Sequence, residues 1–120
     1  MEISRKTGLW GEIYASRYLR EHGYTMIAAN YRTRFGEIDV IVRNKKYLCF
    51  VEVKTRGEGA IAQPKEAVDL SKQKKIIAAS ELFMKSNKYK LQPRYDVCEL
   101  WLDESCQVKK INYIENAYEC

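Results

Sequence analysis

The chain has 120 residues, with 21 Lys and Arg against 16 Asp and Glu, and a formal charge of +5. This length suits a single domain over residues 1–120 and can bury a core without disulfides or structural metal. A hydrophobic content of 46% and a charged content of 31% exclude a disordered or low-complexity chain. No apolar run approaches the roughly 20 residues of a membrane span, and the polar start does not read as a signal peptide. We therefore expect a cytoplasmic protein with no membrane partner.

The side chains that usually build zinc sites and nucleophilic triads are scarce. The four cysteines form no Cys-x-x-Cys pair, and His22 is the only histidine. A zinc site and Ser-His-Asp or Cys-His catalysis are therefore not expected. Cys49 and Cys98 are interpreted as small core residues of strands. The basic charge suits a nucleic-acid partner, although many ordinary domains carry as much.

Helical and strand periodicities alternate along the chain. The second and third strands are close enough to form an antiparallel hairpin, and the strands on either side of the second helix can run parallel. This order predicts an α/β fold with a mixed central sheet flanked by helices. A looser segment is expected over Gly57–Pro64. The predicted elements are, in order, a helix Thr7–His22, strands Tyr24–Tyr31, Gly36–Val42 and Tyr47–Lys54, a helix from Asp69 or Ser71 to Ser86, and strands Tyr95–Leu102 and Val108–Ile114.

One carboxylate interrupts the apolar face of the first predicted helix. A helical wheel places Leu9, Ile13, Ser16 and Leu19 on one face, and Glu12 lies on that same face. A carboxylate within an apolar stripe is costly unless something pairs with it. Glu12 is therefore the first candidate functional residue.

Acidic residues and a lysine share one face of the predicted hairpin. Alternation places Glu37 and Asp39 together on its first strand, and Glu52 and Lys54 together on its second. A two-residue turn at Asn44-Lys45 would put Glu37 opposite Glu52 and make Asp39 a diagonal neighbour of Glu52, at about 7–8 Å. The same register puts Asp39 opposite Phe50 and Ile41 opposite Leu48. A register shift of two residues would keep the acids on the same face.

This cluster of like charges in apolar surroundings needs a cation. Oxygen ligands without His or Cys favour Mg²⁺ or Mn²⁺ over Zn²⁺. Such an ion between Asp39 and Glu52, with Glu12 in reach, suits phosphodiester hydrolysis. Lys54 could hold the attacking water or a non-bridging oxygen. Alternating acids and lysine also describe the solvated face of an ordinary hairpin, and Glu37 could be only a strand-end residue, so both interpretations stay open.

Several longer runs match the pattern of a known family. They are Gly11-Glu12, Asn30-Tyr31-Arg32, Gly36-Glu37-Ile38-Asp39, Phe50-Val51-Glu52-Val53-Lys54-Thr55-Arg56 and Arg94-Tyr95-Asp96-Val97. Together they resemble the YraN family of the PD-(D/E)XK nuclease superfamily, which is similar in outline to archaeal Holliday-junction resolvases. The resemblance implies a restriction-endonuclease-like αβββαβ core.

The resemblance also implies roles for individual residues. Asp39 and Glu52 would be ligands of Mg²⁺ or Mn²⁺, Lys54 the catalytic lysine, and Glu12 the helix carboxylate that completes the site. Ile38 stands at the proline of the superfamily's name, as is common in this branch.

Gln73 lies where related nucleases often have a polar residue on the helix after Glu-x-Lys. Ile77, four residues on, stands where some of them have an aromatic residue. An ordinary role for Gln73 at the start of a helix therefore stays open.

Basic residues flank the candidate site in the predicted fold, where they could track a phosphate backbone. A lysine run on a helix is also commonly just a solvated face. Tyr31 and Phe35 could stack on bases, or belong to the core. The basic residues are Arg32, Arg34, Arg56, Lys72, Lys74 and Lys75.

The leading hypothesis is a Mg²⁺- or Mn²⁺-dependent endonuclease acting on DNA, with branched or damaged DNA as candidate substrates. Two alternatives come from other classes: a non-catalytic nucleic-acid-binding module on a nuclease fold, and an adaptor that needs a partner to complete its site. A homodimer is a further hypothesis, because cutting two strands needs two sites.

Overall fold

The computed structural model describes residues 2–57 and 68–119, and it confirms the predicted order of elements. The first helix begins at Glu2 rather than Thr7, and most of the looser segment expected over Gly57–Pro64 lies outside the described residues. The elements are α1 (Glu2–Glu21), β1 (Thr25–Thr33), β2 (Gly36–Arg43), β3 (Tyr47–Gly57), α2 (Leu70–Asn87), β4 (Gln92–Leu102) and β5 (Val108–Tyr118).

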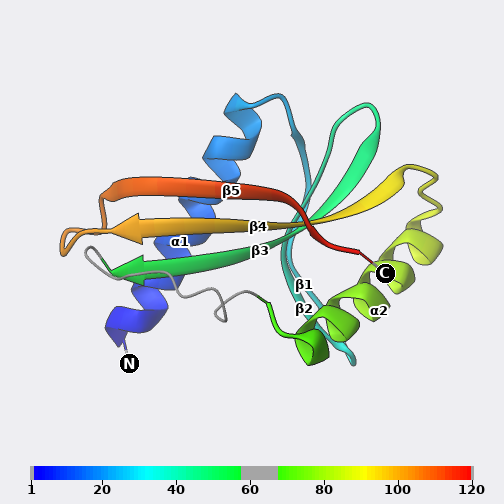
Figure 1. Ribbon diagram of the computed structural model, residues 1–120, viewed down its shortest axis with the longest axis horizontal. Coiled ribbons are helices and arrows are strands. Elements are labelled where there is room, and N and C mark those ends of the chain that lie inside the picture. Colours follow the sequence, from blue (N-terminus) through cyan, green and yellow to red (C-terminus); the bar gives the residue numbers. More distant parts are fainter. Residues whose placement is uncertain (1, 58–67, 120) are drawn as a thin grey trace.

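The strands form one sheet in the order β1-β2-β3-β4-β5. All neighbours are antiparallel except β3 and β4, which run parallel because α2 carries the chain across between them. Figure 1 shows β3, β4 and β5 side by side, with α1 behind them, while β1 and β2 curve away toward α2. This mixed sheet flanked by helices confirms the predicted α/β fold and is compatible with a restriction-endonuclease-like core.

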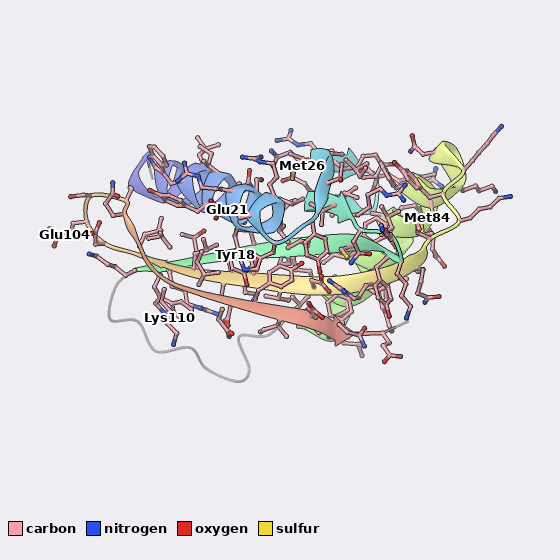
Figure 2. All side chains as sticks on the ribbon, turned by 90° about the horizontal axis from the view of Figure 1, so that it is seen from above. Tyr18, Glu21, Met26, Met84, Glu104 and Lys110 are labelled. Carbon is pink, nitrogen blue, oxygen red and sulfur yellow. The ribbon has the colours of Figure 1, made fainter. Side chains whose placement is uncertain are left out.

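Both faces of the central strands are buried, each in its own core. On β3, Cys49 and Val51 pack in the core that contains residues of α1, whereas Leu48 and Phe50 pack in the core that contains residues of α2. In the view from above, Tyr18 lies between α1 and the sheet (Figure 2), and its ring is 5.7 Å from that of Tyr113. Because both faces of β3 are buried, the sequence of this strand is a nearly continuous run of apolar residues.

The predicted turn at Asn44-Lys45 is wrong by two residues. Arg43 lies opposite Leu48 instead of Lys46, because the Asn44 side chain accepts hydrogen bonds from the backbone N–H groups of Lys46 (2.9 Å) and Tyr47 (2.7 Å) and so builds a longer turn. Every pair derived from the shorter turn is corrected accordingly.

In the corrected register, Ile41 lies opposite Phe50 instead of Leu48, and Val40 lies opposite Val51. The predicted pairs of Glu37 with Glu52 and of Asp39 with Phe50 are therefore wrong too. A shift of two residues preserves the alternation of faces, so the distribution of the acids between the faces is unchanged.

The predicted core face of α1 is also wrong, except for Leu19. Leu9 is 56% exposed and Ile13 48% exposed. The helix instead turns Ala15 and Leu19 inward, in line with Gly11 at spacings of four residues. The cause is the close approach of α1 to Thr55 of β3 at Gly11.

Helix ends follow the expected local chemistry. Gly23, at φ 89°, ends α1, and the N–H of Tyr24 bonds back to the carbonyl of Leu19 at 3.0 Å. Asp69 caps the start of α2 by accepting the N–H of Lys72 at 2.8 Å. Among residues 2–57 and 68–119, neither helix is long and apolar enough to cross a membrane.

Candidate metal and nucleic-acid site

The candidate site lies where the sheet divides between β2 and β3. Pairing between these strands ends at Val40 and Val51. Beyond that point β2 stays paired with β1, and β3 stays paired with β4, so the two strands diverge (Figure 1). Asp39 and Glu52 are the next residues on either side of this fork. The fold therefore brings the two predicted ligands of adjacent strands to one place.

Asp39 is held at the fork by the backbone of the opposite strand. Its Oδ2 accepts the N–H of Val53 at 2.8 Å, which orients the carboxylate. Burial, together with the negative charge of Glu52, raises the pKa of Asp39 from 3.8 to about 7, although the Val53 hydrogen bond opposes this shift. Glu12 of α1, half-buried, acts on Asp39 in the same direction as Glu52. Both of the other predicted carboxylates thus act on Asp39.

Glu52 is almost fully buried and is paired with a lysine of α2. Its side chain is 5% exposed, and its Oε2 lies 2.7 Å from Nζ of Lys72. Burial lowers the pKa of Lys72, but the hydrogen bond and charge of Glu52 outweigh this and leave the pKa raised. The sequence pattern assigned Lys72 to phosphate contact and did not reveal this ion pair, because α2 meets the hairpin only through tertiary packing.

Gly11 determines how close α1 comes to the site. A Cβ at this position would collide with Oγ1 of Thr55 and lie 3.2 Å from its Cβ. The absence of a side chain lets the α1 backbone approach β3 directly before Glu12, which acts electrostatically on Asp39. The resemblance in Gly11-Glu12 thus has a physical reason.

The donor set at the fork fits a hard divalent cation. Within the described part of the chain, no three His, Cys, Asp or Glu side chains already form a group that could hold a metal ion. Mg²⁺ commonly binds one or two protein carboxylates and fills its remaining positions with water and substrate oxygens. Asp39 and Glu52 meet that requirement. The ammonium of Lys72 beside Glu52 shows that the site attracts positive charge.

Lys54 lies two residues beyond Glu52, on the same face of β3. Its register partner on β4 is Glu99, which accepts hydrogen bonds from Arg56 and from Asn112, both at 2.9 Å. Burial would raise the pKa of Glu99, but these bonds and the charge of Lys54 lower it overall. Arg56, with a side chain 14% exposed, pairs with Glu99, and its contact with phosphate stays a prediction.

Gln73 and Glu37, two further predicted site residues, make local contacts. Gln73 donates from Nε2 to the carbonyl of Val68 at 2.8 Å, which ties down the start of α2. Glu37 accepts from Nε of Arg32 at 2.8 Å across the β1–β2 pair. A direct part in the chemistry for either residue stays a prediction.

The remaining predicted basic residues are exposed, and two of them lie near the turn between β1 and β2. Arg34 lies over the ring of Phe35 at 4.9 Å, and the turn at Gly36 comes close to Lys75 of α2. Lys74 is also exposed. Tyr31, the other aromatic residue considered for stacking, instead packs edge-on against Phe83 of the core at 5.0 Å.

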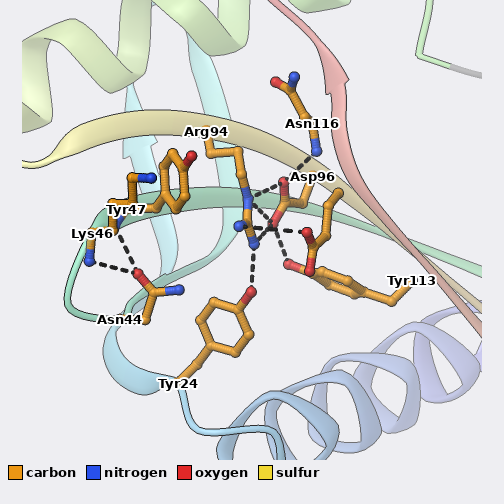
Figure 3. A network of polar contacts seen from close by, with 9 residues as sticks. Tyr24, Asn44, Lys46, Tyr47, Arg94, Asp96, Tyr113 and Asn116 are labelled. Carbon is orange, nitrogen blue, oxygen red and sulfur yellow. Dashed lines mark hydrogen bonds and ion pairs between the residues drawn. The ribbon is translucent and has the colours of Figure 1, made fainter.

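A second polar cluster, missed by the sequence reasoning, lies on β4 (Figure 3). Asp96 is fully buried and forms a two-pronged ion pair with Arg94, with the Nη2 to Oδ2 distance at 2.9 Å. Asp96 also accepts the hydroxyl of Tyr113 (2.6 Å) and the N–H of Asn116 (2.9 Å), while Arg94 donates to the hydroxyl of Tyr24. The cluster joins β4 to β5 and to the start of β1. Charged residues in a strand buried on both faces are the signal that could have identified it.

Known proteins of one family match this chain along most of its length. Residues 11–100, which include all the candidate metal ligands, match the uncharacterised protein family UPF0102. A UPF0102 protein of Alkaliphilus oremlandii is 42% identical over 119 residues, covering 97% of this chain and 100% of the relative. The UPF0102 protein TTE1452 of Caldanaerobacter subterraneus is 39% identical over 120 residues, covering 98% of each chain. A UPF0102 protein of Acetivibrio thermocellus is 38% identical over 119 residues, covering 95% of this chain and 92% of the relative. The chain therefore belongs to the UPF0102 family.

Proposed function

We propose that this chain is a Mg²⁺- or Mn²⁺-dependent nuclease that hydrolyses phosphodiester bonds in DNA. The observation that carries the proposal is the pair Asp39 and Glu52, brought to the fork of the sheet, where burial and the charge of Glu52 raise the pKa of Asp39. A carboxyl group with a perturbed pKa beside a second buried carboxylate is typical of functional sites. The resemblance of the hairpin to the PD-(D/E)XK nuclease superfamily supports the same reading.

Each residue has a distinct role in the proposed reaction. Asp39 and Glu52 would hold the ion, with Asp39 oriented by the Val53 amide, and Glu12 would add negative charge that acts on Asp39. The bound ion supplies Lewis acidity and makes water a better nucleophile. Lys54 orients the attacking water or neutralises a non-bridging oxygen of the phosphate. As the water oxygen bonds to phosphorus it would lose a proton to solvent, one bridging P–O bond would break, and the leaving oxygen would take up a proton from solvent.

The nucleic-acid partner is supported by the charges around the fork. Arg34, Lys74 and Lys75 are exposed where β1, β2 and α2 meet. Lysine and arginine side chains of this kind bind phosphates without reading sequence. We therefore expect contact with the DNA backbone to position a phosphodiester bond at the acids.

Cleavage assays on branched, single-stranded and duplex DNA with Mn²⁺ or Mg²⁺ test the proposal. We expect metal-dependent cleavage by the wild type and its loss in Asp39→Asn, Glu52→Gln and Lys54→Met. Glu81→Gln, a matched change of an exposed carboxylate on α2, should leave cleavage intact.

Cleavage that persists unchanged in Asp39→Asn or Glu52→Gln would overturn this mechanism. Salt-dependent DNA binding with no cleavage of any substrate would instead identify a non-catalytic nucleic-acid-binding module. Mn²⁺ binding without affinity for nucleic acid at low salt would identify an adaptor.

A further inference from the structure

The ion pair between Lys72 and Glu52 occupies the place where the proposed function needs a metal ion. We infer that Lys72 is a built-in counter-ion of Glu52, which the divalent ion displaces and which then becomes a phosphate contact. This inference rests on the proposed function, because it concerns the same metal site. It assigns Lys72 a positioning role that changes with the state of the site.

The backbone of Lys72 is held in place, whereas the end of its side chain can move. Its backbone N–H is held by Oδ1 of Asp69 at 2.8 Å in the first turn of α2. Its side chain is 52% exposed even though Nζ reaches Oε2 of Glu52 at 2.7 Å. The ammonium can therefore leave the carboxylate for solvent by rotation about the side-chain bonds, without any movement of the helix.

Glu52 has no such freedom. With a side chain 5% exposed, it depends on a protein or metal cation for neutralisation rather than on water. A divalent ion bound at about 2.1 Å from a carboxylate oxygen would repel an ammonium still bonded to that oxygen. Binding of the ion and retention of the Lys72 pair are thus in competition.

Charge balance sets the direction of the exchange. The single positive charge of Lys72 can balance only one of the two carboxylates, Glu52 and Asp39. The charge of Lys72 lowers the pKa of Asp39, but this pKa remains raised. A divalent ion can neutralise both carboxylates. The exchange is therefore favourable when the ion is available, but Lys72 reduces the apparent affinity for it.

The displaced ammonium lies close to other phosphate-binding candidates. Lys72, Lys74 and Lys75 all belong to the first turns of α2, and all three are exposed. Once it is released from Glu52, Lys72 adds its charge to this group. Because binding free energies are reciprocal, DNA bound to the released lysine should in turn strengthen metal binding.

Mn²⁺ titration calorimetry on the full chain tests the competition. We expect Lys72→Met to bind Mn²⁺ about tenfold tighter than the wild type, within the usual range of coupling between sites. Lys72→Gln, which keeps a hydrogen-bond donor for Glu52 without the charge, should shift the affinity in the same direction and guards against a folding defect in Lys72→Met. Lys74→Met is the matched control and should leave the Mn²⁺ affinity unchanged.

Equal or weaker Mn²⁺ binding in both Lys72 variants, with binding intact in the wild type, would overturn the inference and leave the proposed function standing. Absence of Mn²⁺ binding in the wild type and in every variant would overturn the proposed metal site itself, and the inference with it. The two failures are therefore distinguishable.

The salt dependence of DNA binding tests the second half of the inference. In a Lys54→Met background, used to prevent cleavage, Lys74→Met should reduce the slope of log Kobs against log salt by about one in both EDTA and Mn²⁺. Lys72→Met should reduce that slope only in Mn²⁺, because Lys72 is occupied by Glu52 in EDTA. An equal effect of Lys72→Met in the two conditions would show that metal binding does not release this lysine.

Discussion

The backbone N–H of Val53 donates to Oδ2 of Asp39 at 2.8 Å, across the point where β2 and β3 separate. A diverging strand leaves ladder donors without a backbone partner, and unpaired buried amides are costly. Here a side chain supplies the missing acceptor. The fork is thereby stabilised and the Asp39 carboxylate is oriented by the same bond, so the fold and the candidate site depend on one contact.

The first prediction concerns the pH dependence of stability in the metal-free protein. Burial and the charge of Glu52 raise the pKa of Asp39 from 3.8 to about 7. Between these values the folded state holds a proton that the unfolded state has lost, so this group's contribution to the free energy of unfolding falls as the pH rises from about 4 to 7. Asp39→Asn keeps an oxygen acceptor for Val53 but removes the charge. We expect it to raise stability relative to the wild type by about 1–3 kcal/mol more at pH 8 than at pH 4.

Urea denaturation at the two pH values, in EDTA, measures this difference. Glu81→Gln, at an exposed position on α2, serves as the control and should show little dependence on pH. A stability difference between Asp39→Asn and the wild type that is the same at both pH values would contradict the raised pKa.

The fold was largely predictable because local signals mark each element. Gly23 ends α1, and alternation along β2 and β3 identifies the hairpin and the face that carries Asp39 and Glu52. The register was wrong by two residues because the Asn44 side chain bonds two backbone N–H groups and lengthens the turn. The length of this turn depends on hydrogen-bond geometry, which the alternation of residue types does not predict.

The candidate site was predictable on the strands and less so on the helices. Which face of α1 is buried follows from the contact of Gly11 with Thr55 rather than from the positions of Leu9 and Ile13. Likewise, Lys72 forms an ion pair with Glu52 only because α2 packs on the face of the hairpin opposite to α1. Contacts of this kind join residues distant in sequence, so the periodicity of residue types within one helix or strand does not predict them.

The second prediction compares two glycines on the same helix. Gly11→Ala should destabilise the protein by about 1–3 kcal/mol, because the added methyl group collides with Thr55 and overpacks the interface between α1 and β3. Gly8 has no heavy atom within 4 Å of an added Cβ. Gly8→Ala should therefore stabilise the protein by about 0.5–1 kcal/mol through its higher helix propensity.

Thermal or urea unfolding of both variants measures the contrast. Thr55→Ala removes the colliding hydroxyl and should restore part of the stability that Gly11→Ala loses. If the two glycine variants change stability in the same direction, the close approach of α1 to β3 is not a determinant of stability.

The third prediction concerns the buried ion pair of Arg94 and Asp96. Asp96 is fully buried, so Arg94→Met leaves its carboxylate with neutral donors, among them Tyr113 and Asn116. Removing one partner of a buried pair typically costs about 3–5 kcal/mol, and we expect a loss of this size in urea denaturation. Arg32→Met is the matched control: its pair with Glu37 has side chains 82% and 36% exposed, so we expect a loss of about 0–1 kcal/mol.

A second substitution distinguishes the cost of the unpaired Asp96 charge from the cost of the packing lost with the Arg94 side chain. Adding Asp96→Asn to Arg94→Met removes the unpaired carboxylate while keeping the size of the side chain, so the double variant should recover part of the lost stability. A double variant less stable than Arg94→Met alone would show that Tyr113 and Asn116 satisfy the carboxylate without Arg94. The structure predicts recovery, because Arg94 is the charged group that bonds to both oxygens of Asp96.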